Sequence, residues 1–264
     1  LQGIKTSKMS TEEVEKQLSE LVEKVKSSEM EANDFMANIG WVAYSKGAVD
    51  VAESCALVAK EAAKDPLARL RAELTLQALD LHQANSGSSS KKNIEAISKF
   101  DETLSSLIRI GDASAIQDCC ILIWNASLVL QKPTCRKFIM HPFSNAVSIL
   151  DKMDSPLVKL RVQFHLELTK GSLENNFLSN AAKHADKGFY LYETFLNQEK
   201  SDEPSGANVR LAKTIKELKK VVDLKSNKVA EKINPYSRKM EVDYNKLEDA
   251  VLQAVERALN AKSQ

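Results

Sequence analysis

Two adjacent thiols, Cys119 and Cys120, are the residues of this sequence with the clearest capacity for chemistry. Thiolates act as nucleophiles or zinc ligands, but neighbouring positions of a helix point about 100° apart, which is a poor arrangement for binding one metal ion. The sequence has no CxxC pair, and its histidines have neither HExxH nor zinc-finger spacing: they are His82, His141, His165 and His184. We therefore predict that both thiols are small buried hydrophobic residues and that the chain has no metal site.

The tripeptide Asn125-Ala126-Ser127 matches the acceptor sequence for N-glycosylation, which requires an exposed loop of a secreted protein. Here it lies inside ILIWNASLVL, a stretch that is apolar nearly all round as a helix. Such a helix is typically central in its fold. The sequence therefore predicts that Asn125 forms hydrogen bonds inside a helix interface and carries no glycan.

Motifs of the common enzyme classes are absent from the sequence. It contains no GxSxG, GxxxxGK[ST] or GxGxxG, and only 8 glycines from which such loops could be built. Its carboxylates alternate with lysines on predicted helix faces, a pattern typical of solvated ion pairs. We expect no catalytic residue, no cofactor and no small-molecule substrate, so the sequence predicts a protein that is not an enzyme.

One local run is strongly basic. Residues 207–239 hold ten lysines and arginines against three acidic side chains. Lys213, Lys216 and Lys220 recur at spacings of three and four, so they share one helix face, and Lys219 belongs to the same run. This pattern favours a solvated outer face of a capping helix, with a binding surface for an acidic tail or a nucleic-acid backbone as the alternative. Nucleic acid is the weaker partner because no aromatic residues are interleaved for base stacking.

Composition indicates an all-α globular protein. The 264 residues are 43% hydrophobic and 28% charged, and 37 basic residues balance 36 acidic ones, which gives no global attraction to nucleic acid or membrane. Only 8 Gly and 6 Pro are too few for the many turns of an all-β fold.

Four cysteines, mostly in apolar helical patterns, favour a reducing compartment. We expect no transmembrane helix, and a first residue other than Met suggests a fragment of a larger chain.

Hydrophobic periodicity and capping residues predict the order of the helices. The polar stretches 85–93 and 197–208 are predicted as a flexible surface loop and a linker. Short connections would make consecutive helices antiparallel neighbours. The predicted helices cover residues 11–30, 33–45, 48–63, 66–84, 94–110, 114–131, 135–153, 156–170, 176–196, 209–233 and 236–261.

An internal repeat defines the architecture. PLARLRAELTLQA at Pro66 and PLVKLRVQFHLEL at Pro156 share Pro, Leu, Leu, Arg and Leu at matching positions, 90 residues apart. That period fits two helical hairpins of ~34–47 residues, the size of tetratricopeptide and HEAT units. We predict an α-solenoid of antiparallel, tetratricopeptide-like hairpins over residues 1–196, a polar linker over 197–208, and a C-terminal helical pair over 209–264 that caps the stack.

The segment CILIWNASLVLQKPTCRKFIMHPFSNAVSILDKMDSPLVKLRVQFHLEL, residues 120–168, resembles the helical-repeat region of the cilia- and flagella-associated protein forty-six family, scaffolds of the central apparatus in motile axonemes. The shared pattern is IWN, a leucine-rich turn, then DSPL and HLEL. Val129 and residues 132–134 depart from the family's leucine-rich turn. The resemblance implies positions that pack the hairpins without a catalytic role, among them Trp124, Asn125, Leu128, Pro156, Leu157, Leu160, Arg161 and Leu166.

The resemblance implies a scaffold that mediates protein-protein interactions in the axoneme of the motile cilium or flagellum. Its partners would be other central-apparatus proteins, including ones associated with tubulin, and its location would be the cytoplasm and cytoskeleton of the cilium. No membrane partner is expected. The alternative from the residues is a regulatory helical-repeat adaptor, which binds acidic peptides or nucleic acid through Lys213, Lys216, Lys219 and Lys220.

Overall fold

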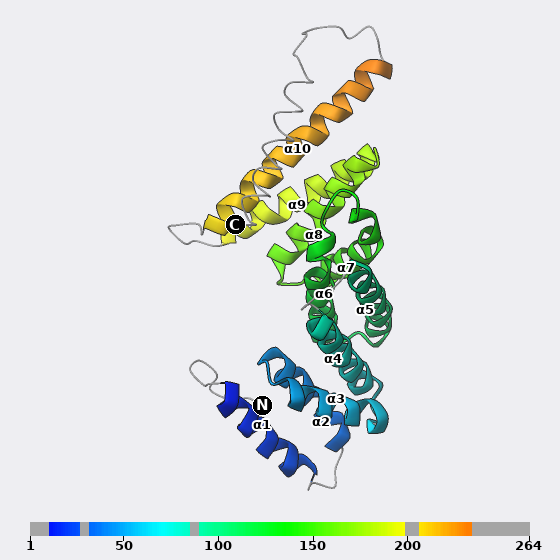
Figure 1. Cartoon of the computed structure of the whole chain (residues 1–264). Coiled ribbons are helices and arrows are strands. Elements are labelled where there is room, and N and C mark those ends of the chain that lie inside the picture. The colour runs from blue at the N-terminus through cyan, green and yellow to red at the C-terminus, as the bar shows by residue number, and fades with distance from the viewer. Residues whose placement is uncertain (1–10, 27–31, 85–89, 199–205, 234–264) are drawn as a thin grey trace. The chain divides into compact units, whose positions relative to one another are not determined.

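The computed structural model describes residues 11–26, 32–84, 90–198 and 206–233 (Figure 1). Helices joined by short turns make up this described part, and no strand occurs in it. Two 3-10 helices, η1 (Leu128–Leu130) and η2 (Arg136–Phe138), follow the sixth α-helix. The α-helices are α1 (Thr11–Lys26), α2 (Ala32–Ser45), α3 (Val49–Ala62), α4 (Pro66–Ala84), α5 (Ser90–Ile110), α6 (Ala113–Ser127), α7 (Met140–Lys152), α8 (Val158–Glu174), α9 (Leu178–Gln198) and α10 (Gly206–Ile233).

Contacts divide the chain into unit 1, Leu1–Leu130, and unit 2, Gln131–Gln264. In unit 1 each helix packs on its neighbour in sequence from α1 to α6, and α2 also contacts α4. In unit 2, α7 packs on α8, α8 on α9, and α10 on both α9 and α8. Packing between helices close in sequence is the organisation of an α-solenoid, so the predicted fold class is confirmed.

The pair α5 and α6 shows directly that neighbouring helices are antiparallel. Asn93 Nδ2 donates to the carbonyl oxygen of Ala126 at 2.9 Å. Seven residues further along α5, the carbonyl oxygen of Phe100 accepts from Cys119 Sγ at 3.3 Å. From the first hydrogen bond to the second, the residue number rises by seven on α5 and falls by seven on α6. The two helices therefore run in opposite directions in constant register.

Local sequence explains where several helices end and begin. Gly47 and Gly111 have φ of 81° and 84°, a left-handed conformation that favours glycine and ends α2 and α5. Asp112 then caps α6, accepting from the backbone N–H of Ala115 at 2.7 Å. Asp34 Oδ1 accepts from the backbone N–H of Lys64 at 2.9 Å, which fixes the entry to α4.

Small residues let α2 and α3 approach closely in unit 1. A Cβ at Gly40 would lie 3.3 Å from both the carbonyl oxygen of Ala52 and the backbone nitrogen of Ala56. Ala37 and Ala43 are fully buried beside them. In unit 2, Ala181 and Ala185 on α9 belong to a core with leucine and valine side chains of α8 and α10. These positions match the small-residue faces that tight helical hairpins need.

The predicted helix over 66–84 has the bounds of α4, but other boundaries differ. The loop expected over 85–93 is wrong in its last four residues, because α5 begins at Ser90 and Asn93 is buried with 2% exposure. The side-chain amide of Asn93 donates a hydrogen bond to a backbone carbonyl oxygen of α6, and this hydrogen bond offsets the cost of burying the amide. The helix predicted over 135–153 is divided into η2 and α7.

The predicted C-terminal helix over 236–261 and residues 199–205 of the predicted linker lie outside the described residues. The division into solenoid, linker and capping pair therefore remains a prediction. Of the predicted pair, α10 is described and packs on α9 and α8.

Candidate binding surfaces

Both adjacent thiols lie in the core of unit 1. Cys119 and Cys120 are fully buried, and Cys55 is buried as well. Burial raises the pKa of Cys120 to about 12 and that of Cys119 well above its usual range. Because the thiol forms persist at neutral pH, these side chains act as small core residues, as predicted. In the described part of the chain, no group of three or more His, Cys, Asp or Glu residues could hold a metal ion.

The helix α6 is not enclosed on all sides, contrary to the prediction from its apolar sequence. Its opposite faces differ: Ile116 and Ile123 are buried, whereas Ile121 is 38% and Leu128, in η1, is 54% exposed. Asn125 is exposed, so the predicted burial in a helix interface is wrong. Trp124 is half-buried. A packed helix needs only one apolar face, and the solvent-facing positions here are simply apolar as well.

Residues Ala113–Leu130, which form α6 and η1, also pass a test of length and composition for crossing a membrane, with a mean hydropathy of 1.5. This finding differs from the prediction that the sequence contains no transmembrane helix. Half of it is buried inside the protein, and the core helix of a folded domain passes the same test.

The most enclosed helix of the described residues is instead α8, which carries many charged side chains. Apart from the partly buried Gln163, every residue from Arg161 to Leu173 is buried. Of the residues predicted to pack the hairpins here, Arg161 and Leu166 are buried, with 3% and 5% exposure. Leu157 and Leu160 are half-buried, and Pro156 is exposed just before the helix begins.

A buried charged cluster connects α8 to η2 in unit 2. Arg136 Nε donates to Glu167 Oε2 at 3.0 Å, and Lys170 Nζ donates to Glu167 Oε1 at 2.5 Å. Arg136 also pairs with Glu174 and donates to the carbonyl oxygen of Gln131 at 3.1 Å. Two cations thus face two anions, which lets the side chains of Arg136 and Glu167 be buried with 5% and 6% exposure. This neutral cluster has a structural role.

A second buried network joins α7, α8 and α9. Arg161 Nε donates to Asp151 Oδ1 at 2.9 Å, and His165 Nε2 lies 3.1 Å from Asp151 Oδ2. His165 Nδ1 lies 3.0 Å from His184 Nδ1. The carboxylate of Asp151 accepts from the N–H at His165 Nε2, and one of the two facing Nδ1 atoms of His165 and His184 donates to the other.

The two networks change the pKa values of their members. Burial alone would raise the pKa of Asp151, but hydrogen bonds from His165 and Arg161 outweigh it and lower the pKa. Burial, followed by the nearby His165 and Lys183, lowers the pKa of His184 from 6.5 to about 4. His184 is therefore neutral at physiological pH.

In unit 1, the arginine of the sequence repeat also connects helices through side-chain hydrogen bonds. Arg71, which matches Arg161 in the repeat, donates from Nη1 to Asn38 Oδ1 at 2.8 Å and from Nη2 to Asp112 Oδ1 at 3.0 Å. Its Nε is buried with no hydrogen-bond partner among the described residues. Arg71 thus connects α4 to α2 and to the N-terminal cap of α6.

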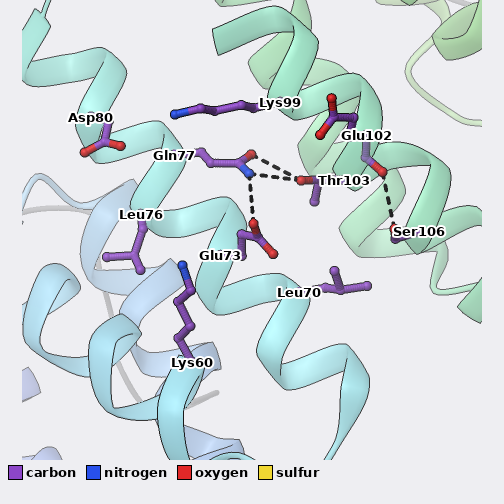
Figure 2. Close-up of a pocket in the computed structure, with 10 residues that line it drawn as sticks. All are labelled: Lys60, Leu70, Glu73, Leu76, Gln77, Asp80, Lys99, Glu102, Thr103 and Ser106. Carbon is purple, nitrogen blue, oxygen red and sulfur yellow. Dashed lines mark hydrogen bonds between the residues drawn. The ribbon is translucent and has the colours of Figure 1, made fainter. Parts of the chain in front are cut away.

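An open groove runs between α4 and α5 in unit 1, with a volume of about 450 Å³ (Figure 2). We name it the α4–α5 groove. At its centre Gln77 and Thr103 bond to each other, with Gln77 Nε2 lying 3.1 Å from Thr103 Oγ1. Its lining residues are Lys60, Leu70, Glu73, Leu76, Gln77, Asp80, Lys99, Glu102, Thr103 and Ser106.

The register of the two helices orders these side chains along the groove. Because α4 and α5 are joined by a short connection, they run antiparallel, and Gln77 opposes Thr103. One turn away in one direction, Asp80 opposes Lys99, and in the other direction Glu73 opposes Ser106. Figure 2 shows the same order, with Asp80 and Lys99 on one side of the Gln77–Thr103 pair and Ser106 on the other. Sequence reasoning missed this groove, since its residues look like an ordinary solvated helix face.

The predicted basic face of α10 is present but is less uniform than its sequence. Lys213, Lys216 and Lys220 are exposed. Lys219 instead contacts α9: its Nζ lies 2.9 Å from Asp186 Oδ1 and 4.8 Å from the ring centroid of Phe189. The hydrogen bond to Asp186 raises the pKa of Lys219. Lys219 therefore helps to hold α10 on α9, while Lys213, Lys216 and Lys220 are exposed, with Lys213 Nζ 3.9 Å from Glu217 Oε1.

No family model matches the chain. The cilia- and flagella-associated protein 46 of Chlamydomonas reinhardtii is similar to it, with 29% identity over 99 residues. The matched segment is 38% of this chain but only 4% of that protein, so the chain corresponds to a small part of its relative. The chain thus shows a distant, partial similarity to a cilia-associated protein, in agreement with the coarser form of the resemblance predicted from the sequence.

Proposed function

We propose that this chain is a segment of a non-enzymatic scaffold that mediates protein-protein interactions in the axoneme of the motile cilium or flagellum, within its central apparatus. The observation that carries the proposal is the similarity to cilia- and flagella-associated protein 46 over 99 residues. On this proposal the chain lies in the cytoskeleton of the cilium, with other axonemal proteins as its partners.

The fold is well suited to such a role. Helices packed on their neighbours in sequence give extended surfaces, and the stability of the stack grows with each added hairpin. Buried charged side chains of unit 2 are paired internally, as Arg136 and Glu167 are, whereas the α4–α5 groove of unit 1 is open. An open groove beside a rigid stack can bind an extended partner without chemistry at the site.

Cross-linking with mass spectrometry on intact, demembranated axonemes tests the proposal. The sample is motile cilia from cells that make this protein, and the search is for cross-linked peptides of this chain. We expect links to neighbouring proteins of the central apparatus. Absence of the chain from purified axonemes, with its presence in the soluble fraction of the same cells, would contradict the proposal.

A second candidate function is a regulatory adaptor that binds an acidic peptide. The exposed amines of Lys213, Lys216 and Lys220 favour it, since α10 presents them on its outer side while Lys219 packs inward. Binding should weaken with rising salt and with the triple change to Glu. A matched control is Lys91→Glu, because Lys91 is 84% exposed and lies on α5. Equal loss of binding in both variants would reject a specific basic surface.

A further inference from the structure

The α4–α5 groove has the length of a short extended peptide. Its lining on α4 extends from Leu70 to Asp80. Ten residues of helix rise about 15 Å. An extended chain advances about 3.3 Å per residue, so four or five residues span the groove. The volume of about 450 Å³ is enough for several side chains of such a segment.

The charged side chains that line the groove form no ion pairs within the described part of the chain. Glu73, Asp80 and Glu102 line it together with Lys60 and Lys99. Among the described residues, none of these five side chains forms an ion pair, in contrast to the paired charges of α8. Carboxylates are the majority, and Glu73 at one end is half-buried. An incoming cation is therefore the complementary charge at that end.

The centre of the groove can bind a peptide main chain. Gln77 and Thr103 use their polar atoms on each other, and Gln77 Nε2 also lies 3.5 Å from Glu73 Oε1. An amide side chain offers both a donor and an acceptor, which match the C=O and N–H of an extended backbone. A bound segment can thus exchange hydrogen bonds with Gln77 while its side chains reach the ends of the groove.

From this combination of length, charge and polar centre, we propose that the α4–α5 groove is the docking site for an extended segment of a partner protein, and that the half-buried Glu73 binds a lysine or arginine side chain of that segment. The proposal deepens the proposed scaffold function and rests on it. It names the surface of unit 1 that engages a partner and the chemistry of the segment engaged.

Lysine footprinting on intact axonemes tests whether the groove is occupied. Lys60 and Lys99 are exposed in the isolated chain and line the groove, so an occupant should shield their amines from a small acylating reagent. Lys91 is the matched control, since it lies on α5 outside the groove with 84% exposure. We expect labelling of Lys60 and Lys99 to be on the order of tenfold slower in axonemes than in the isolated chain, with Lys91 unchanged. Equal labelling of all three lysines in both samples would overturn the proposal.

Charge reversal tests the chemistry of the occupant. The change Glu73→Arg should restore labelling of Lys60 and Lys99 in axonemes to the rate of the isolated chain. Glu53→Arg, an exposed change of the same kind on α3, should leave their protection intact. Circular dichroism of each isolated variant establishes that the helices still form. Protection that persists in Glu73→Arg would exclude a basic side chain bound at Glu73.

The two proposals fail in different ways. If the chain is present in axonemes but its groove lysines label freely, the scaffold proposal stands and the groove proposal is wrong. If the chain is absent from axonemes, the scaffold proposal fails first. Amine-reactive cross-links from Lys60 or Lys99 to a peptide rich in Lys or Arg would support both.

Discussion

The helices α4 and α8 carry the two copies of the sequence repeat, yet they occupy very different environments. Arg71 and Arg161 match in the repeat, and each binds an aspartate. Around Arg161 almost the whole helix is buried, and its charged residues pair inside unit 2. Around Arg71 one face of the helix remains open and lines the α4–α5 groove. The same short pattern can therefore form either a central helix or one wall of a binding groove, depending on what covers it.

Removal of one charge from the buried cluster of α8 should have the largest effect. Glu167→Gln leaves Arg136 and Lys170 facing each other with only Glu174 as counter-ion, so we expect a loss of about 3–5 kcal/mol in the free energy of unfolding. Urea denaturation followed by helical circular dichroism measures it. The control is Glu95→Gln, at an exposed carboxylate 3.9 Å from Lys91, which should cost below about 0.5 kcal/mol. Similar costs in both variants would show that burial does not strengthen the cluster.

The two matched arginines offer the most direct test of the comparison. Arg161→Met should lower the free energy of unfolding by about 2–3 kcal/mol, because the side chain is 4% exposed and Asp151 loses a charged donor. Arg71→Met should cost about 1 kcal/mol, since that side chain is 19% exposed. The change also removes a buried Nε that has no partner. The same denaturation assay ranks them, and a larger loss for Arg71 would reverse the comparison.

Acid should weaken the α8 region through His184. Its pKa falls from 6.5 to about 4 on folding, so the unfolded chain binds this proton more readily than the folded one. The associated stability is complete above pH 6.5 and is lost as pH falls towards about 4. Urea midpoints at about pH 7 and about pH 5 should therefore differ more in the natural chain than in His184→Gln. An equal difference in both proteins would exclude His184 as the source.

Changes on the open face of α4 should have the smallest effect on stability. Glu73→Gln and Asp80→Asn remove carboxylates that form no ion pair with any described residue, so each should change the free energy of unfolding by less than about 0.5 kcal/mol. Thermal denaturation is sufficient to detect a larger change. Losses comparable with that of Glu167→Gln would mean that the groove residues hold the fold together, and the contrast between α4 and α8 would disappear.

Several features were determined by the sequence alone. Scarce Gly and Pro with helical periodicity predicted the all-α fold, and Pro66 correctly marked the start of α4. The apolar surroundings of Cys119 and Cys120 predicted their burial. These predictions depend on local spacing and on neighbours in the same helix, which the sequence contains directly.

Only the tertiary structure decided which helix is enclosed and which face stays open. The apolar α6 exposes Ile121 and Asn125, whereas the charged α8 is buried, because Arg136 and His184 reach it from other elements and satisfy its polar groups. Asn93 was expected in a loop, yet it is buried because its amide meets the carbonyl oxygen of Ala126. The α4–α5 groove likewise has at its centre a hydrogen bond between Gln77 and Thr103, which lie on different helices. Burial of a polar residue depends on partners that are distant in sequence, and hydrophobic periodicity carries no information about them.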